Sequence, residues 1–564
     1  MHARYAVTFE RGLRRQQLAA KSAELGLHVK FDSGRMLLVA DEKTPVLAGS
    51  EGAAVGQLFD ADGRKLNELP QFEALNVLLE RTWGNFVLLH EGESGGNVYR
   101  DPSGSISLYR IAGRHGDVLV SDAELALSLG LLAEREVDLD FVVHWLQFPY
   151  LRSARTGIRQ VREILPGMMG NGSASDWSEA LRWRPWDHSR RKSLPSGLRD
   201  LGNGLRLVAE RAIAAQTKGA TLLLQLSGGL DSSIIAACLA ASGASFTAVN
   251  FVSRSADGDE RRHARAVAER FGISLFEIHE HALRGTIEAP LERKFRPGSN
   301  PILVPLDEAV ENHRLEIGAE LLVDGGGGDN LFCYLEGAAP VLDALFAYGP
   351  REALHAAADV AEQAGANLWQ VLAATPRHML PKGWRHWNED RRFLKTDSLL
   401  ACADPHPWLN APPLALPGKR DHVASLVHIQ HFLDRRVGAG GAVIHPLMAQ
   451  PLLESCLAIP TREWVRGGVD RAVARDAFRN LLPASVIERR SKGSLQGLFH
   501  RSFERIHSEL KDLLLSGRLR GLGIADPNAV ERAFDADQRS EPETQMRLSE
   551  MAALELWLQS WSAD

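Results

Sequence analysis

The first 150 residues alternate short apolar runs with turn-forming residues. Residues 36–40 and 84–89 are apolar runs, and residues 60–63 (Asp-Ala-Asp-Gly) and 101–104 (Asp-Pro-Ser-Gly) are typical of the segments between such runs. Short apolar runs bounded by Gly, Asp, Asn and Pro predict strands joined by turns. We therefore expect mainly antiparallel sheet in this part, followed by a polar linker over residues 171–197.

The period of the pattern changes near residue 198. Apolar residues recur at helical spacing over 201–213, and residues 221–226 then form a short apolar strand. A helix follows residue 233, a second strand covers 246–251, and another helix covers 260–271. Alternating strands and helices predict a doubly wound parallel sheet. From about residue 340 onward the pattern is mostly helical.

Composition excludes several classes of protein. The chain has 564 residues, of which 45% are hydrophobic and 24% charged, and its formal net charge is −6. This length predicts two to four domains, and the charge balance excludes a polybasic nucleic-acid binder or an acidic disordered tail. No apolar run is long enough to predict a membrane span. Four cysteines without disulfide-like spacing, and no secretory leader, predict a cytoplasmic protein.

One loop between a predicted strand and a predicted helix has the composition of an anion-binding site. It consists of Ser227, Gly228, Gly229, Leu230, Asp231, Ser232 and Ser233. Its glycines let the backbone approach an anion, its serines add hydroxyl donors, and the following helix offers unpaired N–H groups. A carboxylate in such a loop would repel phosphate unless a cation lay between them, so we expect Asp231 to hold Mg²⁺ against a triphosphate. The alternative is that Asp231 only caps the helix.

This loop resembles the pyrophosphate-binding loop of N-type ATP pyrophosphatases, and much of the chain resembles the asparagine synthetase family. The other segments that carry the resemblance are residues 83–86, 100–109, 156–158, 165–167, 257–272, 322–332 and 482–493. The resemblance implies an α/β fold with two parts. A degenerate, inactive glutaminase-like αββα domain of the Ntn type is expected over 1–190. An ATP-dependent amide ligase domain, with a doubly wound sheet like that of adenine nucleotide α-hydrolases and a helical C-terminal part, is expected over 198–564.

The resemblance also implies the parts of a site for ATP and Mg²⁺. Asp329 ends a second glycine-rich loop and would bind Mg²⁺ together with Asp231, and Lys492 would be the catalytic lysine that stabilises the oxyanion and the phosphate charge. The remaining ATP contacts are expected from Leu226, Ser227, Gly228, Gly229, Ser232, Ser233, Val249, Asp324 and Gly325. Arg475 and Arg489 are weaker candidates for phosphate or substrate contacts.

Two departures from the family's pattern concern the N-terminal part. A working glutaminase needs a cysteine directly after the initiator methionine, and this chain has His2 there. An imidazole cannot replace a thiolate whose own α-amine serves as its base. The family's Asn-Gly-Glu substrate motif is also missing, so we expect no ammonia from glutamine. The first 200 residues are then either a structural relic or a docking surface.

A third departure indicates the kind of synthetase. Asparagine synthetases have glutamate at the positions of Gly326 and Asn330, and β-lactam-forming relatives have tyrosine at that of Gly326, whereas this loop is Gly-Gly-Gly-Gly-Asp-Asn. That form resembles the lasso peptide cyclases, which are macrolactam synthetases. Four glycines would leave room for a substrate larger than aspartate, although a purely structural glycine run is the alternative.

The leading hypothesis is therefore an ATP-dependent lasso peptide macrolactam synthetase. It would adenylate an Asp or Glu side chain of a leaderless core peptide and join it to the peptide's N-terminal amine. The resemblance implies a core peptide as substrate, and a leader peptidase and a leader-recognition protein as partners, with no nucleic acid and no membrane. The alternatives are a small-molecule amide or β-lactam synthetase, an ammonia-dependent asparagine synthetase-like enzyme, or an inactive nucleotide-binding scaffold. The histidines at 422, 428, 431 and 445 could suggest a metal site. However, His428 and His431 lie on an amphipathic helical stretch, and no carboxylate completes a ligand pattern, so we do not expect one.

Overall fold

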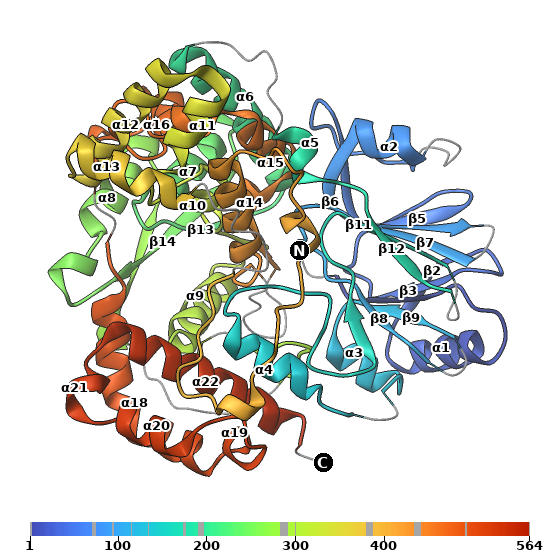
Figure 1. The fold of residues 1–564 in the computed structure, drawn as a ribbon. Coiled ribbons are helices and arrows are strands. Elements are labelled where there is room, and N and C mark those ends of the chain that lie inside the picture. The colour runs from blue at the N-terminus through green and yellow to red at the C-terminus, as the bar shows by residue number, and fades with distance from the viewer. Residues whose placement is uncertain are drawn as a thin grey trace.

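A computed structural model gives the fold in Figure 1. The residues that it describes are 3–69, 75–92, 95–113, 116–132, 135–172, 176–189, 197–282, 292–298, 300–378, 387–433, 442–490 and 493–562. These residues form two six-stranded antiparallel sheets, one five-stranded parallel sheet and the helices around them. In Figure 1 the antiparallel sheets lie on the right in blue and cyan, and the parallel sheet lies on the left.

The two antiparallel sheets form a layered structure that we call the N-terminal sandwich. The first sheet has the order β10-β8-β9-β1-β3-β2, and the second has the order β12-β11-β7-β6-β5-β4. The strands are β1 (Tyr5–Thr8), β2 (His28–Asp32), β3 (Leu37–Ala40), β4 (Val46–Ala48), β5 (Gly52–Asp60), β6 (Thr82–Gly92), β7 (Gly95–Arg100), β8 (Tyr109–Ile111), β9 (Val118–Val120), β10 (Val161–Glu163), β11 (Met168–Gly172) and β12 (Ser178–Leu181).

Side chains that alternate along the strands build the layers of the sandwich. Leu38 packs between the two sheets with Val55 of β5, whereas its neighbour Val39 packs on the outer side of the first sheet. The helices α1 (Leu13–Glu24), α3 (Ala123–Ser128) and α4 (Leu139–Gln147) lie on that outer side, and α2 (Leu75–Arg81) contributes to the core on the far side of the second sheet. This period of two places helices outside two stacked sheets, which is the predicted αββα arrangement.

The parallel sheet has the order β15-β14-β13-β16-β17. Its strands are β13 (Leu222–Gln225), β14 (Phe246–Val252), β15 (Leu275–His279), β16 (Leu321–Val323) and β17 (Ala442–Ile444). One face packs on α6 (Leu198–Thr217), α7 (Leu230–Ala241) and α8 (Arg261–Phe271), and the other packs on α9 (Val304–Glu316) and the start of α18 (Gln496–Ser516). A parallel sheet with helices on both faces is the predicted doubly wound fold, so the predicted fold class is confirmed.

Helices make up most of the rest of the chain. The helices between β16 and α18 are α10 (Gly328–Leu331), α11 (Ala339–Tyr348), α12 (Pro350–Ala364), α13 (Leu368–Ala374), α14 (Pro417–Ile429), α15 (Gln450–Ala458), α16 (Ala472–Phe478) and α17 (Ala484–Ile487). The last ones, after α18, are α19 (Arg518–Gly521), α20 (Pro527–Ala533), α21 (Ala536–Arg539) and α22 (Pro542–Ser560). They share a core with the outer side of the first antiparallel sheet, and Figure 1 shows red α22 beside cyan α4.

The predicted linker over residues 171–197 is wrong for its described part. Residues 176–189 contain the strand β12 and the short helix α5 (Pro185–His188). Among the described residues β12 pairs only with β11, at the edge of its sheet, and two of its four residues, Ser178 and Ala180, are exposed. An edge strand with a solvated face lacks the apolar run from which a strand is predicted.

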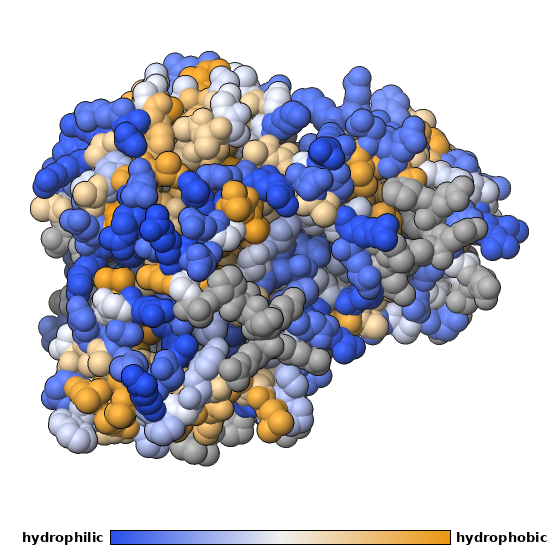
Figure 2. All heavy atoms as spheres, turned by 90° about the horizontal axis from the view of Figure 1, so that it is seen from above, coloured by the Kyte–Doolittle hydropathy of each residue, from blue (hydrophilic) through white to orange (hydrophobic). Residues whose placement is uncertain are grey.

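The hydrophobic surface and the cysteines complete the description of the fold. No helix within the described ranges is long and apolar enough to cross a membrane, and the surface in Figure 2 is mostly hydrophilic with apolar residues in small, scattered areas. The four cysteines are free thiols, and Cys402 is the exposed one.

Candidate functional site

The order of the parallel strands determines where the two glycine loops meet. The chain proceeds from β13 outward to β14 and β15, and then returns to the other side of β13 with β16 and β17. The direction therefore reverses between β13 and β16, and open α/β sheets bind ligands at the carboxyl ends of the strands at such a reversal. The loop after β13 covers residues 226–229. The loop after β16 covers residues 324–327, and together with Gly328, the first residue of α10, we call it the glycine loop.

The loop after β13 is folded tightly by its own hydroxyl groups. Ser227 Oγ accepts the N–H of Gly229 at 3.2 Å and lies 3.2 Å from Ser232 Oγ, while Ser233 Oγ donates to the Gly229 carbonyl at 2.7 Å. Gly228 has φ of +75°, and a Cβ there would lie 2.5 Å from the backbone nitrogen of Ala264 on α8. Only glycine fits this turn, which brings α7 and its first-turn residue Asp231 to the edge of the sheet.

All four glycines of the glycine loop are packed closely. A Cβ on Gly325 would lie 3.1 Å from the Ser232 nitrogen, and one on Gly328 would lie 2.3 Å from the carboxyl carbon of Asp231. Gly327 has φ of +86° and faces the Met448 sulfur. Gly325 and Gly328 therefore let this loop close against the start of α7, which brings the two loops together.

Gly326 does not open a space for a larger substrate, because His445 occupies that volume. A Cβ at Gly326 would lie 2.8 Å from His445 Nδ1 and 2.9 Å from Asp324 Oδ1. His445 Nδ1 and Asp324 Oδ1 are 2.5 Å apart, and the same carboxylate oxygen accepts the Gly326 N–H at 2.9 Å. The structure therefore supports the structural reading of this glycine, and the prediction that it gives room to the substrate is wrong.

The two aspartates that the sequence predicts as metal ligands lie at one point. Arg471 Nη1 donates to Asp231 Oδ1 at 3.2 Å and to Asp329 Oδ1 at 2.5 Å. Asp231 is 8% exposed, so its carboxylate needs a cationic partner. Burial by itself would lower the pKa of Arg471, but the carboxylates of Asp231, Asp329 and Asp470 raise it above its ordinary value.

Carboxylate oxygens suit Mg²⁺. The guanidinium of Arg471 already places one positive charge beside both carboxylates. Two carboxylates leave most of an octahedral shell to water and phosphate oxygens, which is how Mg²⁺ is usually bound beside nucleotides. Within the described ranges, no cluster of three or more histidine, cysteine, aspartate or glutamate side chains could hold a metal alone. The residues therefore fit a metal that arrives with a triphosphate.

Sequence reasoning missed Arg471. It has φ of +51° and ψ of +36° at the start of α16, a left-handed conformation that costs a non-glycine residue about 1–3 kcal/mol. Its guanidinium lies 5.5 Å from the ring centroid of Tyr334, three residues after the last residue of α10. In the sequence it is one arginine among many, and only the fold places it between the two aspartates.

The other predicted residues have defined positions where they are described. Leu226 directly follows β13, whereas Val249 lies in the middle of β14 and not at its end, as was expected. Both are buried, and the Leu226 N–H donates to the Val249 carbonyl at 2.8 Å. Lys492 lies outside the described residues. On either side of it, Arg489 Nη1 and the Gly493 N–H both contact Glu260 Oε1, at 2.8 and 3.0 Å.

Arg475 and His422 serve packing in the described structure. Arg475 is 5% exposed and donates to the carboxylate of Asp470 and to the Ile487 carbonyl. His422 is fully buried, with Nε2 3.1 Å from the Leu331 carbonyl, and burial lowers its pKa to about 3. A phosphate contact from Arg475 would require these bonds to break.

A model of the family described as asparagine synthase matches residues 204–559. The curated relative "tRNA-specific 2-thiouridylase MnmA" from Rhizorhabdus wittichii is 33% identical over 125 residues, which are 19% of this chain. The chain spans only 33% of that relative's length.

Two solved structures are similar at low scores. The U34-tRNA thiolase NcsA from Methanococcus maripaludis is 13% identical with a TM-score of 0.18, covering 41% of this chain and 81% of that one. The glutamine phosphoribosylpyrophosphate amidotransferase from B. subtilis is 10% identical with a TM-score of 0.21, covering 58% of this chain and 82% of that one. Because both scores are low, neither structure indicates the activity of this chain.

Proposed function

The chain belongs to the asparagine synthase family, and from this premise we propose that it is an ATP-dependent lasso peptide macrolactam synthetase. Membership makes it an ATP-using synthetase; the lasso peptide substrate is the proposal. The observation that carries the proposed chemistry is the meeting of Asp231, Asp329 and Arg471 where two glycine loops join.

The first step activates a carboxylate. A carboxylate oxygen of the substrate attacks the α-phosphorus of ATP, the bond to the β-phosphate oxygen breaks, and pyrophosphate leaves. The loop after β13 offers backbone N–H groups and the hydroxyls of its serines to the phosphates. Mg²⁺ held by Asp231 and Asp329 would neutralise charge on the departing pyrophosphate. Arg471, a permanent cation beside both carboxylates, supports the same charge balance.

The second step forms the amide. The amine nitrogen attacks the acyl carbon of the adenylate, the carbon–oxygen bond to AMP breaks, and the amine loses a proton. Overall the peptide loses one water while ATP becomes AMP and pyrophosphate. We assign Lys492 to the oxyanion and the phosphate charge, where loss of one such donor typically costs about 3–4 kcal/mol.

The substrate class rests on what the chain lacks. Position 326 carries neither the glutamate of asparagine synthetases nor the tyrosine of β-lactam-forming relatives, and position 2 carries no cysteine. An N-terminal α-amine, with a pKa of about 8, needs little help to deprotonate. An intramolecular amine also needs no ammonia source, and correct orientation can supply about 7–11 kcal/mol of the barrier. An amide or β-lactam synthetase for a small acid is the second candidate.

Purified protein, Mg-ATP and the leaderless core peptide encoded beside its gene test the proposal, with the peptidase added in a parallel reaction. Loss of one water from the peptide, with equal amounts of AMP and pyrophosphate, is the expected result. Pyrophosphate release with small acids but no peptide would select the second candidate. No turnover with any acid or peptide would reject both.

A further inference from the structure

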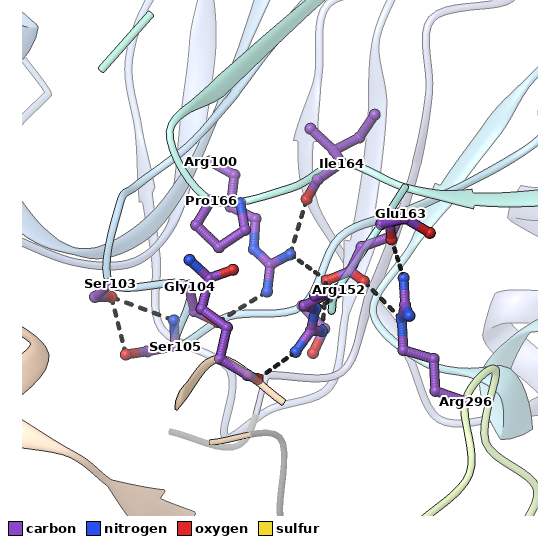
Figure 3. A network of polar contacts seen from close by, with 12 residues as sticks. Arg100, Ser103, Gly104, Ser105, Arg152, Glu163, Ile164, Pro166 and Arg296 are labelled. Atoms are coloured by element: carbon purple, nitrogen blue, oxygen red, sulfur yellow. Dashed lines mark hydrogen bonds and ion pairs between the residues drawn. The ribbon is translucent and has the colours of Figure 1, made fainter. Parts of the chain in front are cut away.

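The N-terminal sandwich contacts the synthetase part through buried polar side chains. Glu163 at the end of β10 is fully buried and binds Arg100 at 2.7 Å, Arg296 at 2.8 Å, and Arg152 (Figure 3). Burial opposes its ionisation, but the three guanidiniums hold the pKa of Glu163 well below its usual range. Arg152 also donates to the Gln430 carbonyl at 2.8 Å, which ties the end of α14 to the sandwich.

A second buried contact crosses the same interface. Asn85 on β6 donates from Nδ2 to Gln216 Oε1 on α6 at 3.0 Å, and its Oδ1 accepts Ser103 Oγ at 3.2 Å. Gln216 Nε2 in turn donates to the Pro446 carbonyl at 3.2 Å. Asn85 is 2% exposed and Gln216 is 6% exposed, so neither amide can exchange these partners for bulk water without opening the interface.

These contacts lead to the glycine loop. Pro446 directly follows His445, whose Nδ1 meets Asp324 and whose Nε2 lies 3.1 Å from the Leu433 carbonyl. Asp324 then binds the Gly326 N–H. The segment just before Leu433 also packs on the sandwich side, where the ring of Tyr150 lies 5.0 Å from that of Phe432. Both chain segments that hold His445 are therefore bonded to or packed on the sandwich.

We propose that the sandwich positions the glycine loop through Asn85, Gln216 and His445, and that this is why a chain without the glutaminase nucleophile retains it. The three are positioning residues, because they act on Asp324 and the loop rather than on a reacting atom. Hydrogen bonds join Asn85 of β6 to Gln216 and Gln216 to the Pro446 carbonyl. His445, which directly precedes Pro446, contacts Asp324, and Asp324 accepts the N–H of Gly326, three residues before Asp329. This inference rests on the proposed function, since it assigns the sandwich a part in synthetase turnover.

Two variants test it in the full chain. Asn85→Leu removes the donor to Gln216 at similar size. Gln216→Glu keeps an acceptor for Asn85 but loses the donor to Pro446, so the sandwich contact survives while the onward bond is broken. Asn97→Leu, at a half-buried asparagine on the neighbouring strand β7, is the matched control. The readouts are hydrogen exchange of the peptide that covers residues 323–333, the rate of pyrophosphate release, and the KM for ATP.

We expect both test variants to exchange the glycine-loop amides about tenfold faster, as for loss of one buried hydrogen bond. The kcat for pyrophosphate release should fall about 10- to 100-fold, as for a small displacement of positioned groups. The KM for ATP should change less than about threefold. On a logarithmic scale this is about half of the tenfold effect expected for the loss of one buried hydrogen bond. In a His445→Ala background, Asn85→Leu should lower kcat no further, because the connection is already broken.

Several outcomes would overturn the inference. Glycine-loop exchange equal to that of Asn97→Leu in both test variants would do so, and so would additive losses of kcat in the double variant. If the wild-type protein releases no pyrophosphate with any acid or peptide, the proposed function fails, while the exchange measurement still decides whether the sandwich holds the loop.

Discussion

Replacing Arg471 with methionine should separate the charge of this side chain from its packing. The Arg471 side chain is 9% exposed, and its Nη1 contacts the carboxylates of Asp231 and Asp329, whose side chains are 11% and 34% exposed. Removing one partner of a buried pair costs about 3–5 kcal/mol, because the other charge stays buried and loses that partner. Since solvent screens Asp329 in part, we expect a loss of about 3 kcal/mol, mostly from Asp231.

A divalent cation should return part of that stability, because it supplies the missing charge between the carboxylates. At ten times its dissociation constant, Mg²⁺ adds about 1.4 kcal/mol to the free energy of unfolding. Urea denaturation of Arg471→Met with and without Mg²⁺, at constant ionic strength, measures this gain. In the wild-type protein the gain should be smaller, because Arg471 already balances the two charges.

Arg314→Met provides the control. Arg314 forms an equally buried pair with Glu311 on α9, with exposures of 6% and 8% and a distance of 2.7 Å, outside the two glycine loops. It should lose a similar free energy of unfolding and recover none of it with Mg²⁺. Equal Mg²⁺ responses in the two variants would refute the conclusion that Asp231 and Asp329 form a cation site.

Three further changes test other parts of the account. Lys492→Met should leave ATP binding unchanged and slow amide formation by about 10²- to 10³-fold; full activity in a product assay would reject its role. Gly328→Ala should lower pyrophosphate release by about 10²-fold, because the new Cβ would lie 2.3 Å from the Asp231 carboxyl carbon, whereas Gly521→Ala, with open space around it, should match wild type. Burial, with a smaller contribution from Lys419, lowers the pKa of His422 to about 3. Between about pH 6.5 and pH 3 the unfolded chain therefore binds a proton at this residue that the folded chain does not bind. The free energy of unfolding should fall as the pH falls through this range. His422→Gln, which keeps a donor for the Leu331 carbonyl, should lose less stability between pH 7 and pH 5 in urea titrations, and an unchanged pH dependence would contradict the assignment.

The main parts of the fold follow from local sequence signals. A period of two with turn residues predicts the sandwich, and strands that alternate with helices predict the parallel sheet. The edge strand β12 escaped prediction because its polar residues reflect a solvated face, and its identity depends on pairing with β11. Signals of that kind are tertiary and are absent from a short window of sequence.

The site could be predicted only in part. Asp231 was named from the composition of its glycine loop, and Asp329 from the resemblance to the asparagine synthetase family. The structure places both carboxylates beside Arg471, and their role as Mg²⁺ ligands stays a prediction. Arg471, and the contact of His445 with Asp324, could not be found, because each joins residues more than 100 positions apart along the chain. Gly326 was interpreted as room for substrate because its sequence neighbours do not reveal that His445 occupies the space.

Transfer of oxygen from the substrate to the nucleotide tests the central claim most directly. The core peptide, with ¹⁸O in the side-chain carboxylate of its Asp or Glu, is incubated with the protein and Mg-ATP, and the nucleotide products are weighed. If that carboxylate attacks the α-phosphorus, AMP carries one ¹⁸O and pyrophosphate carries none. Formation of ADP with labelled phosphate, or of AMP without label, would contradict activation of the carboxylate as an adenylate.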